Sequence, residues 1–232
     1  MPKFSVIVPE HNSAAWMRKG LDMIKAQSFT DYELIIVCDR CSDNTAEIAR
    51  EYTDNVLEVD FGRAGLSRNA GLDAATGEYI LWADDDDWYL HEFAFEMIAE
   101  ALDAIREEGH TVDILCYSFI WKGQGYTMNE PTRLWPAIWN KCWRREFIGD
   151  ERFPDWAHSD DFGFAKKMHP KAIMNHTLFF YDTPLYYYNF MRPGSVSDNI
   201  KNGEYDNDEL PEDIRAVADD YEQTLRDGGL TG

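Results

Sequence analysis

Apolar segments rich in β-branched residues alternate with helical segments over the first 110 residues, and this alternation constrains the fold most. The predicted strands are FSVIV at 4–8, DYELIIVCDR at 31–40, NVLEVDF at 55–61 and EYILWAD at 78–84. Pro9 is expected to stop the first of them. Helical patterns lie between the strands, and a longer one follows at 92–109. The first of them is expected to place Trp16, Leu21 and Ile24 on one side, and the pattern at 65–77 ends at Gly77, a C-cap type residue. Strands and helices in this order predict an α/β domain with a parallel sheet covered on both faces.

The pattern becomes less regular after Gly109. We expect a strand at 111–121, short strands and loops at 122–158, a helix at 160–168, one or two strands at 176–190, and a last helix at 210–225. This last helix lies in an acidic tail, because residues 198–232 hold 11 acidic and 3 basic residues. At 232 residues the chain is expected to form either one large domain or a domain with a small appendage.

The formal net charge of -21 argues against passive electrostatic capture of nucleic acid or of an anionic membrane. The same acidity fits a protein that holds divalent cations. No signal peptide precedes the first strand, and no apolar run approaches the ~20 residues that cross a bilayer. We therefore expect a cytoplasmic protein without an integral membrane segment.

The sequence has four cysteines, which we expect to be free thiols in such a protein. Cys38 and Cys41 form a C-x-x-C motif. A second pair is missing, which disfavours a zinc site.

Four consecutive aspartates, Asp84 to Asp87, end the fourth apolar segment. In an extended segment Asp84 and Asp86 would point to one side, and Asp85 and Asp87 to the other. Such a D-x-D pair can hold Mg²⁺ or Mn²⁺ and leave coordination positions open for phosphates. The structural alternative is an acidic turn that caps the following helix, and the spacing required for a calcium loop is absent.

Other polar groups follow the ends of the predicted strands. PEHN at 9–12 follows the first strand and Asp39 the second, so the sheet would gather them with the aspartates along one edge. Asp160 and Asp161 form a second acidic pair, which is either a helix start or the source of a general base. Arg192, in a Gly/Pro turn, is either a phosphate clamp or part of a surface loop.

These motifs together resemble the family 2 glycosyltransferases of the GT-A fold. The resemblance covers residues 4–197 and rests on SVIVPEHN, DYELIIVCDRCSDNT, GLSRNAGLDAATGEYILWADDDDW, WNKCWRREF, the Asp-Asp pair and RPGSVS, in this order. It implies an α/β fold with a Rossmann-like, mostly parallel central sheet, helices on both faces, a small mixed acceptor-side region and a C-terminal helix. It also implies a nucleotide-binding half at about 1–110, an acceptor-binding half at 111–197, and an acidic tail at 198–232.

The resemblance further implies a metal-dependent, inverting transfer of a sugar from a nucleotide-diphospho-sugar, expected to be a UDP-sugar, to an acceptor hydroxyl. By motif match, the nucleotide contacts would be Pro9, Glu10, Asn12, Asp39, Arg68, Asp84, Asp85 and Asp87. Asp86 and Asp84 would hold Mn²⁺ or Mg²⁺, and Arg192 and Lys141 would stabilise the diphosphate. Asp161 would be the catalytic base, and Asp160 would either support it or touch the acceptor.

The chain departs from the family pattern at several positions. Cys38 and Arg40 replace the first aspartate and the glycine of a frequent Asp-Asp-Gly-Ser motif, and His11 stands where an aromatic residue is common. The acidic pair is Asp-Asp rather than Glu-Asp. The chain also lacks the membrane helices of processive synthases, which favours single additions.

The acceptor would be a glycan, a glycolipid or another hydroxyl compound. Trp135 and Trp139 either stack on acceptor sugars or pack in the core. The acidic helix at 210–225 is either a homodimer surface or a cap, and peripheral association with the inner face of a membrane stays open.

Three other functions compete with this interpretation. A degenerate, non-catalytic transferase would bind nucleotide or glycan, but both acidic clusters are retained. A sugar nucleotidyltransferase usually has a Gly-rich basic loop after its first strand, which PEHNSAAWMRKG lacks. A metal-dependent phosphohydrolase would need more clustered His and Asp ligands, and the six histidines are scattered.

Overall fold

The computed structural model describes residues 1–122, 125–127, 134, 136–189 and 192. Trp135 and the predicted C-terminal helix with its acidic tail lie outside the described residues. Within the described part of the chain, no helix is long and apolar enough to cross a membrane.

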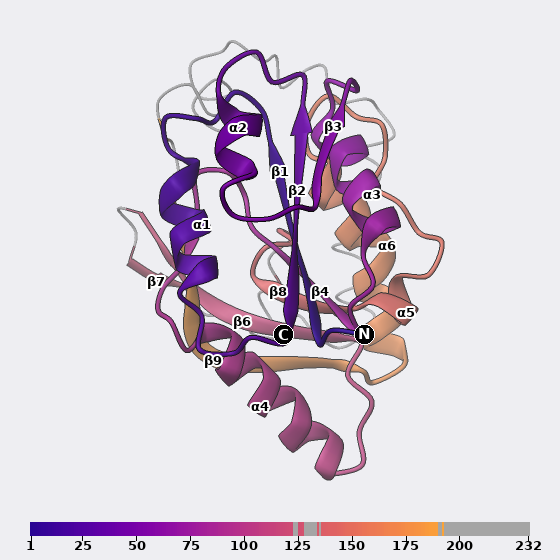
Figure 1. The fold of residues 1–232 in the computed structure, drawn as a ribbon. Coiled ribbons are helices and arrows are strands. Elements are labelled where there is room, and N and C mark those ends of the chain that lie inside the picture. The colour runs from indigo at the N-terminus through magenta and orange to yellow at the C-terminus, as the bar shows by residue number, and fades with distance from the viewer. Residues whose placement is uncertain (123–124, 128–133, 135, 190–191, 193–232) are drawn as a thin grey trace.

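The first half of the chain forms the parallel part of the sheet. Its elements are β1 (Phe4–Glu10), α1 (Met17–Lys25), β2 (Tyr32–Asp39), α2 (Thr45–Ala49), β3 (Val56–Val59), α3 (Ala64–Ala74) and β4 (Tyr79–Trp82). The strands lie in the order β3-β2-β1-β4, and every neighbouring pair is parallel. In Figure 1, α1 and α2 lie on one side of β1 and β2, and α3 lies on the other. The predicted parallel sheet with helices on both faces is confirmed.

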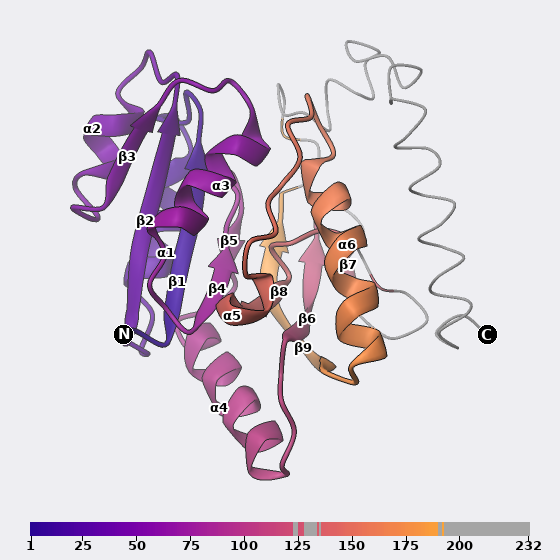
Figure 2. The same cartoon turned by 90° about the vertical axis from the view of Figure 1, so that its right-hand side faces the viewer.

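The second half extends the sheet with mixed strand directions. Its elements are β5 (Trp88–Tyr89), α4 (Ala94–Glu107), β6 (Ile114–Trp121), β7 (Gly125–Thr127), β8 (Lys141–Arg144), α5 (Arg145–Ile148), α6 (Asp160–Met174) and β9 (Leu178–Tyr188). The order continues β4-β8-β6-β9-β5, with β7 paired to β6. Among the described strands of this half, β6 and β9 form the parallel pair, whereas β8 runs antiparallel to both its neighbours. Figure 2 shows the two halves side by side.

Two local expectations are corrected by the structure. Pro9 does not end β1, because it continues the register opposite Val37 and the strand runs on to Glu10. Gly77 is not the cap of α3, which ends at Ala74. Gly77 instead passes so close to β1 that an added Cβ would lie 2.5 Å from the Ser5 amide nitrogen.

Helix α1 shows how the amphipathic helices attach to the sheet. It buries Met17, Leu21 and Ile24, which follow helical spacing. Trp16, which was expected on this face, precedes the helix and is only partly buried. Its position leaves the indole free to contact the segment that follows β4.

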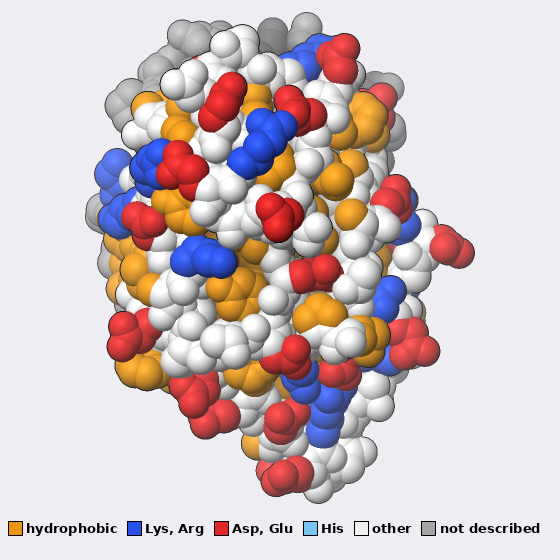
Figure 3. Space-filling model, viewed as in Figure 1, with side chains coloured by type: hydrophobic (Ala, Val, Ile, Leu, Met, Phe, Trp, Pro, Cys, Tyr) orange, Lys and Arg blue, Asp and Glu red, His pale blue; other side chains and the backbone are white. Residues whose placement is uncertain are grey.

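Acidic and basic side chains are interspersed over the face of the molecule in Figure 3. Exposed ion pairs such as Arg18 with Glu51 are part of this mixed surface. Such pairs contribute little to stability. The charges that bear on function are therefore the buried ones at the carboxyl ends of the strands.

Candidate functional site

Asp84 to Asp87 form a tight turn after β4 and not an extended segment. The Asp87 amide donates to the Asp84 carbonyl oxygen at 3.2 Å. The expected alternation of side chains to two sides is therefore wrong. Like charges repel more strongly where solvent is excluded, and the turn relieves this repulsion by sending each carboxylate to a different partner.

Arg68, on α3, connects the two acidic clusters. Its guanidinium donates to Asp84 Oδ1 at 2.9 Å and to Asp160 Oδ2 at 2.5 Å. Only 8% of Arg68 is exposed, so both ion pairs are largely shielded from water. One side chain thus joins the turn after β4 to the start of α6, although the two aspartates lie 76 positions apart in the sequence.

Arg192 forms the second ion pair of the acidic turn. Its Nε donates to Asp86 Oδ2 at 2.6 Å, and its guanidinium carbon lies 3.9 Å from the centre of the Trp16 ring. The indole Nε1 of Trp16 donates to Asp85 Oδ2 at 3.1 Å. Trp16 and Arg192 therefore lie together against the turn.

The innermost aspartate of the turn is Asp87, which is 1% exposed. Its Oδ1 accepts a hydrogen bond from the Asn189 amide at 2.8 Å. Burial and the neighbouring carboxylates raise the pKa of Asp87 well above its ordinary value. Burial, together with Asp86, also raises the pKa of Asp85 to about 7. The turn thus favours a bound cation or proton.

Asp161 lies in the first turn of α6, next to the Arg68-bound Asp160. Its Oδ1 accepts a hydrogen bond from the Phe162 amide at 2.8 Å. Burial and the charge of Asp160 raise its pKa to about 6, and Arg68 opposes this shift. A carboxylate with this pKa can accept a proton near neutral pH.

The end of β1 contributes a buried glutamate. Glu10 is 2% exposed, and its Oε2 accepts a hydrogen bond from Ser13. Its other oxygen, Oε1, has no hydrogen-bond partner among the described residues. Burial and Asp85 raise the pKa of Glu10 well above its ordinary value. Close by in sequence, Asn12 accepts a hydrogen bond from the Ser42 amide at 2.7 Å.

Asp39, at the end of β2, organises the loop between β3 and α3. Its carboxylate accepts hydrogen bonds from four donors, the amides of Phe61, Gly62 and Arg63 and the hydroxyl of Ser67. Burial raises the pKa of Asp39, but these hydrogen bonds outweigh it, so the pKa is lowered. The carboxylate is thus fixed as an anion beside Phe61, which is 42% exposed.

Two expected contacts are replaced by interactions inside the protein. Lys141 is fully buried, and its ammonium group donates to the Ala137 carbonyl and to Asn140 Oδ1 rather than facing a diphosphate site. Trp139 is 3% exposed and stacks on Tyr186 at 4.9 Å between ring centres. Its ring faces are covered, so it packs in the core and does not offer a surface to a sugar.

The carboxylates of the turn suit a hard divalent cation in kind. No group of three or more His, Cys, Asp or Glu that could hold a metal occurs among the described residues. Asp84 and Asp86 nevertheless offer oxygen donors at positions that already accept a cationic partner each. Mg²⁺ and Mn²⁺ are often held by one or two carboxylates together with substrate phosphates, and this donor set fits that arrangement.

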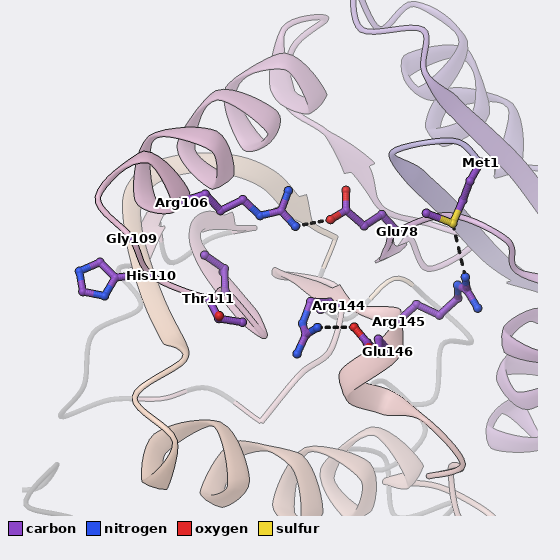
Figure 4. A pocket seen from close by; sticks show the side chains of 10 residues that line it. Met1, Glu78, Arg106, Gly109, His110, Thr111, Arg144, Arg145 and Glu146 are labelled. Atoms are coloured by element: carbon purple, nitrogen blue, oxygen red, sulfur yellow. Dashed lines mark hydrogen bonds and ion pairs between the residues drawn. The ribbon is translucent and has the colours of Figure 1, made fainter.

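A separate cavity of about 760 Å³ lies at the opposite end of the sheet, where β4 begins. Arg106, Arg144 and Arg145 line it together with Glu78 and Glu146 (Figure 4). Arg106 pairs with Glu78 and Arg144 with Glu146, so the cavity is largely neutralised by its own residues. None of the predicted site residues lines it.

Sequence reasoning missed several residues that hold the acidic turn. Trp16 contacts Asp85, Tyr186 accepts a hydrogen bond from the Asp84 amide at 3.0 Å, and Asn189 contacts Asp87. No sequence signal marks them, because they come from segments about 70 to 100 positions away.

Comparison with known proteins identifies the family of this chain. The family model described as Glycosyl transferase family 2 matches residues 5–169. The chain is 28% identical over 217 residues to the putative glycosyltransferase EpsH of Bacillus subtilis, which covers 81% of this chain and 60% of that protein. It is 36% identical over 123 residues to the poly(ribitol-phosphate) beta-N-acetylglucosaminyltransferase TarS of Staphylococcus aureus, which covers 50% of this chain and 20% of that protein. The chain thus spans less than two thirds of these relatives.

Solved structures share the fold. S. aureus TarS 1–349 in complex with UDP-GlcNAc aligns with a TM-score of 0.74 at 24% identity, over 96% of this chain and 66% of that chain. The mannosyltransferase PcManGT from Pyrobaculum calidifontis, in complex with GDP-Man and Mn²⁺, aligns with a TM-score of 0.65 at 19% identity, over 88% and 61%. The α/β architecture is therefore that of the GT-A structures.

Proposed function

The chain belongs to glycosyltransferase family 2, and on this premise we propose that it transfers a sugar from a UDP-sugar to an acceptor hydroxyl. The observation that carries the proposal is the double ion pair of Arg68 with Asp84 and Asp160. It brings the end of β4, where nucleotide and metal would bind, next to the start of α6, where a base would act. UDP is favoured as the nucleotide because TarS, the structural relative with the higher of the two TM-scores, was solved with UDP-GlcNAc.

The donor would lie along the carboxyl ends of β1, β2 and β4. In open α/β sheets, ligands bind beyond these ends. Asp39 and the loop that it holds would border the base, with Pro9, Glu10 and Asn12 beside it. Arg68, Asp85 and Asp87 would shape the remainder of the nucleotide pocket. Asn12 is partly exposed and Phe61 is 42% exposed, so both side chains would be accessible to the nucleotide.

The diphosphate would be held at the acidic turn. Asp86 and Asp84 would bind Mn²⁺ or Mg²⁺, which when bound neutralises charge on the leaving nucleoside diphosphate. Arg192 already pairs with Asp86 and would pass from it to the diphosphate. Such contacts accelerate transfer if they are stronger in the transition state than in the ground state.

Asp161 would be the general base. A sugar hydroxyl is a poor nucleophile, and a carboxylate within hydrogen-bond reach can take its proton as the new bond forms. Asp160 is held by Arg68, whereas Asp161 has a raised pKa of about 6 and suits proton transfer. Attack from the face opposite the leaving group would invert the anomeric centre. Asp160 would keep α6 in register with the turn.

The test is turnover and binding in Asp161→Asn. We expect UDP to bind this variant in Mn²⁺ as it binds the wild type, while release of UDP from a UDP-sugar in the presence of acceptor falls by ~10²-fold or more. Wild-type transfer by Asp161→Asn would place the base elsewhere. Wild-type protein that binds UDP but turns over no UDP-sugar with any acceptor of a glycan panel would favour a non-catalytic binding module.

A further inference from the structure

Asp39 lies where the ends of three strands come together. It is the last residue of β2, and its backbone carbonyl oxygen lies 2.7 Å from Nδ1 of His11, which follows β1. Its carboxylate holds the amides of Phe61, Gly62 and Arg63 in the loop after β3. This loop therefore lies at the carboxyl edge of the sheet, beside the proposed nucleotide pocket.

The carboxylate of Asp39 has no acceptor position left for a ligand. A carboxylate offers about four lone-pair positions, two on each oxygen. Oδ1 accepts hydrogen bonds from the amides of Phe61 and Gly62 at 2.8 and 2.9 Å. Oδ2 accepts them from the Arg63 amide at 3.1 Å and from the Ser67 hydroxyl at 2.9 Å. Because Asp39 is also only 5% exposed, a base could bond to its carboxylate only by displacing the loop.

Two further contacts restrict the same loop. Gly62 has a φ of 65°, in the left-handed region that glycine adopts without strain, and an added Cβ would collide with the Arg40 guanidinium. Arg40 itself pairs with Asp60, the residue before Phe61. The backbone of Phe61 is thus held by Asp39 on one side and bordered by the Arg40 side chain on the other.

The ring of Phe61 is left uncovered on this restrained loop. It is 42% exposed, and it stacks on no other ring among the described aromatic residues. Single exposed apolar residues are common on protein surfaces, but this one lies at the edge where ligands of open α/β sheets bind. A flat apolar ligand that covered the ring would remove it from water, and a nucleotide base has such a face.

We propose that the base of the nucleotide stacks on the Phe61 ring, and that Asp39 positions this ring rather than bonding to the base. The inference rests on the proposed function, because it assumes a nucleotide at the carboxyl ends of β1 and β2. Every base has a flat π face, so the contact supplies affinity for any nucleotide. Selection of uracil among the bases falls to polar groups elsewhere in the pocket.

A pair of ligands separates stacking from hydrogen bonding. In dihydro-UDP the carbon–carbon double bond of the base is reduced, so the ring is no longer aromatic, but the N–H and C=O groups of uracil remain. We expect the wild-type protein in Mn²⁺ to bind UDP about tenfold more tightly than dihydro-UDP in calorimetric titrations. Phe61→Ala should bind UDP about tenfold more weakly than the wild type and should discriminate little between the two ligands. Phe61→Tyr, which keeps a flat ring, should restore the affinity and the discrimination.

Phe93→Ala is the matched control. Phe93 is 48% exposed and precedes α4, where the neighbouring Glu92 carbonyl accepts the Ser28 amide near the opposite end of β2. This variant should bind UDP as the wild type does. Phe61→Ala should unfold in urea close to the wild type, because the ring that it removes is exposed.

The role of Asp39 is tested by combining two substitutions. Asp39→Asn loses acceptor positions for the loop, so we expect it to weaken UDP binding about tenfold and to reduce the discrimination against dihydro-UDP. In the Phe61→Ala background the same change should have little further effect, because the ring that Asp39 positions is already absent. Additive losses in the double variant would show that Asp39 acts on the nucleotide itself.

The titrations also separate this inference from the proposed function. Wild-type UDP affinity in Phe61→Ala, or weaker binding in that variant with full discrimination against dihydro-UDP, would overturn the stacking role while the proposed function stands. If the wild-type protein binds no UDP in Mn²⁺, the proposed function fails and the inference fails with it.

Discussion

Arg192 donates to Asp86 at 2.6 Å across 106 positions of sequence, and in doing so places a cation at the turn after β4. The pair is only partly exposed, with 17% and 13% of the two side chains accessible. The positive charge of Arg192 offsets the repulsion between Asp86 and the other carboxylates of the turn. Arg192 and a divalent ion would therefore both be attracted to the carboxylate oxygens of the turn. The donor diphosphate would add further oxygens, so that both cations could stay bound.

The first prediction concerns Asp86. We expect Asp86→Asn to remove Mn²⁺-dependent UDP binding, because the amide supplies a weaker oxygen ligand and cannot pair with Arg192 as an anion. The loss should be about tenfold or more in the dissociation constant measured by calorimetry. Asp103→Asn is the matched control, since Asp103 is exposed on α4 and pairs with Lys3. Equal loss in both variants would indicate a general effect of charge.

Arg68 should matter for stability as well as for function. Arg68→Met leaves Asp84 and Asp160 without their cation, and removing one partner of a buried pair typically costs ~3–5 kcal/mol. The measurement is the free energy of unfolding in urea. Arg152→Met, which breaks an exposed pair with Asp73, should change it far less. Similar, small losses in both variants would show that the Arg68 pairs are not effectively buried.

The raised pKa of Asp161 predicts the direction in which activity and stability change with pH. Its pKa is raised to about 6, so the folded state holds the proton more tightly than the unfolded chain, whose aspartates titrate near ~3.9. Stability should therefore fall as pH rises from about 4 to 6, by about 3 kcal/mol, and then level off. Turnover should rise over the same range, because the base must be ionised.

Comparison with Asp161→Asn isolates this group. Between about pH 4 and 6 the free energy of unfolding should fall less in the variant than in the wild type, because an asparagine amide does not titrate. At pH 7 the variant should be the more stable of the two proteins. Unfolding free energies of both proteins at several pH values make the comparison. A variant that is less stable than the wild type at pH 7 would contradict the raised pKa.

Trp139 should act on folding and not on acceptor recognition. Trp139→Ala removes a buried ring that stacks on Tyr186 and packs on Phe119. Deleting such a ring typically costs ~3–5 kcal/mol of stability. A variant with wild-type stability and a raised KM for acceptor would restore the expected stacking role.

The sequence predicted the fold from its apolar runs, because a strand buried on both faces must be apolar throughout its length. The runs that became β1, β2 and β4 have this property, and the polar groups after them do meet at one edge. The conformation of the acidic turn could not be predicted in this way. It depends on Arg68, Trp16 and Arg192, whose proximity is created only by the tertiary structure.

Lys141 and Trp139 show the other limit of sequence reasoning. A lysine and a tryptophan in a segment without a clear helix or strand pattern indicate ligand contacts as readily as core packing. Both side chains are buried, which decides for packing inside the protein. The burial of Trp139 depends on β9, an element that comes later in the sequence and whose Tyr186 stacks on its ring. Residue type and spacing carry no information on that packing.

Titration of UDP into the wild-type protein, first with Mn²⁺ and then with excess EDTA, tests the central claim most directly. The account predicts saturable binding of UDP with Mn²⁺ and its loss in EDTA, with GDP, ADP, CDP and TDP binding more weakly. Absence of binding by every one of these nucleotides in Mn²⁺ would contradict a nucleotide-sugar site at the acidic turn.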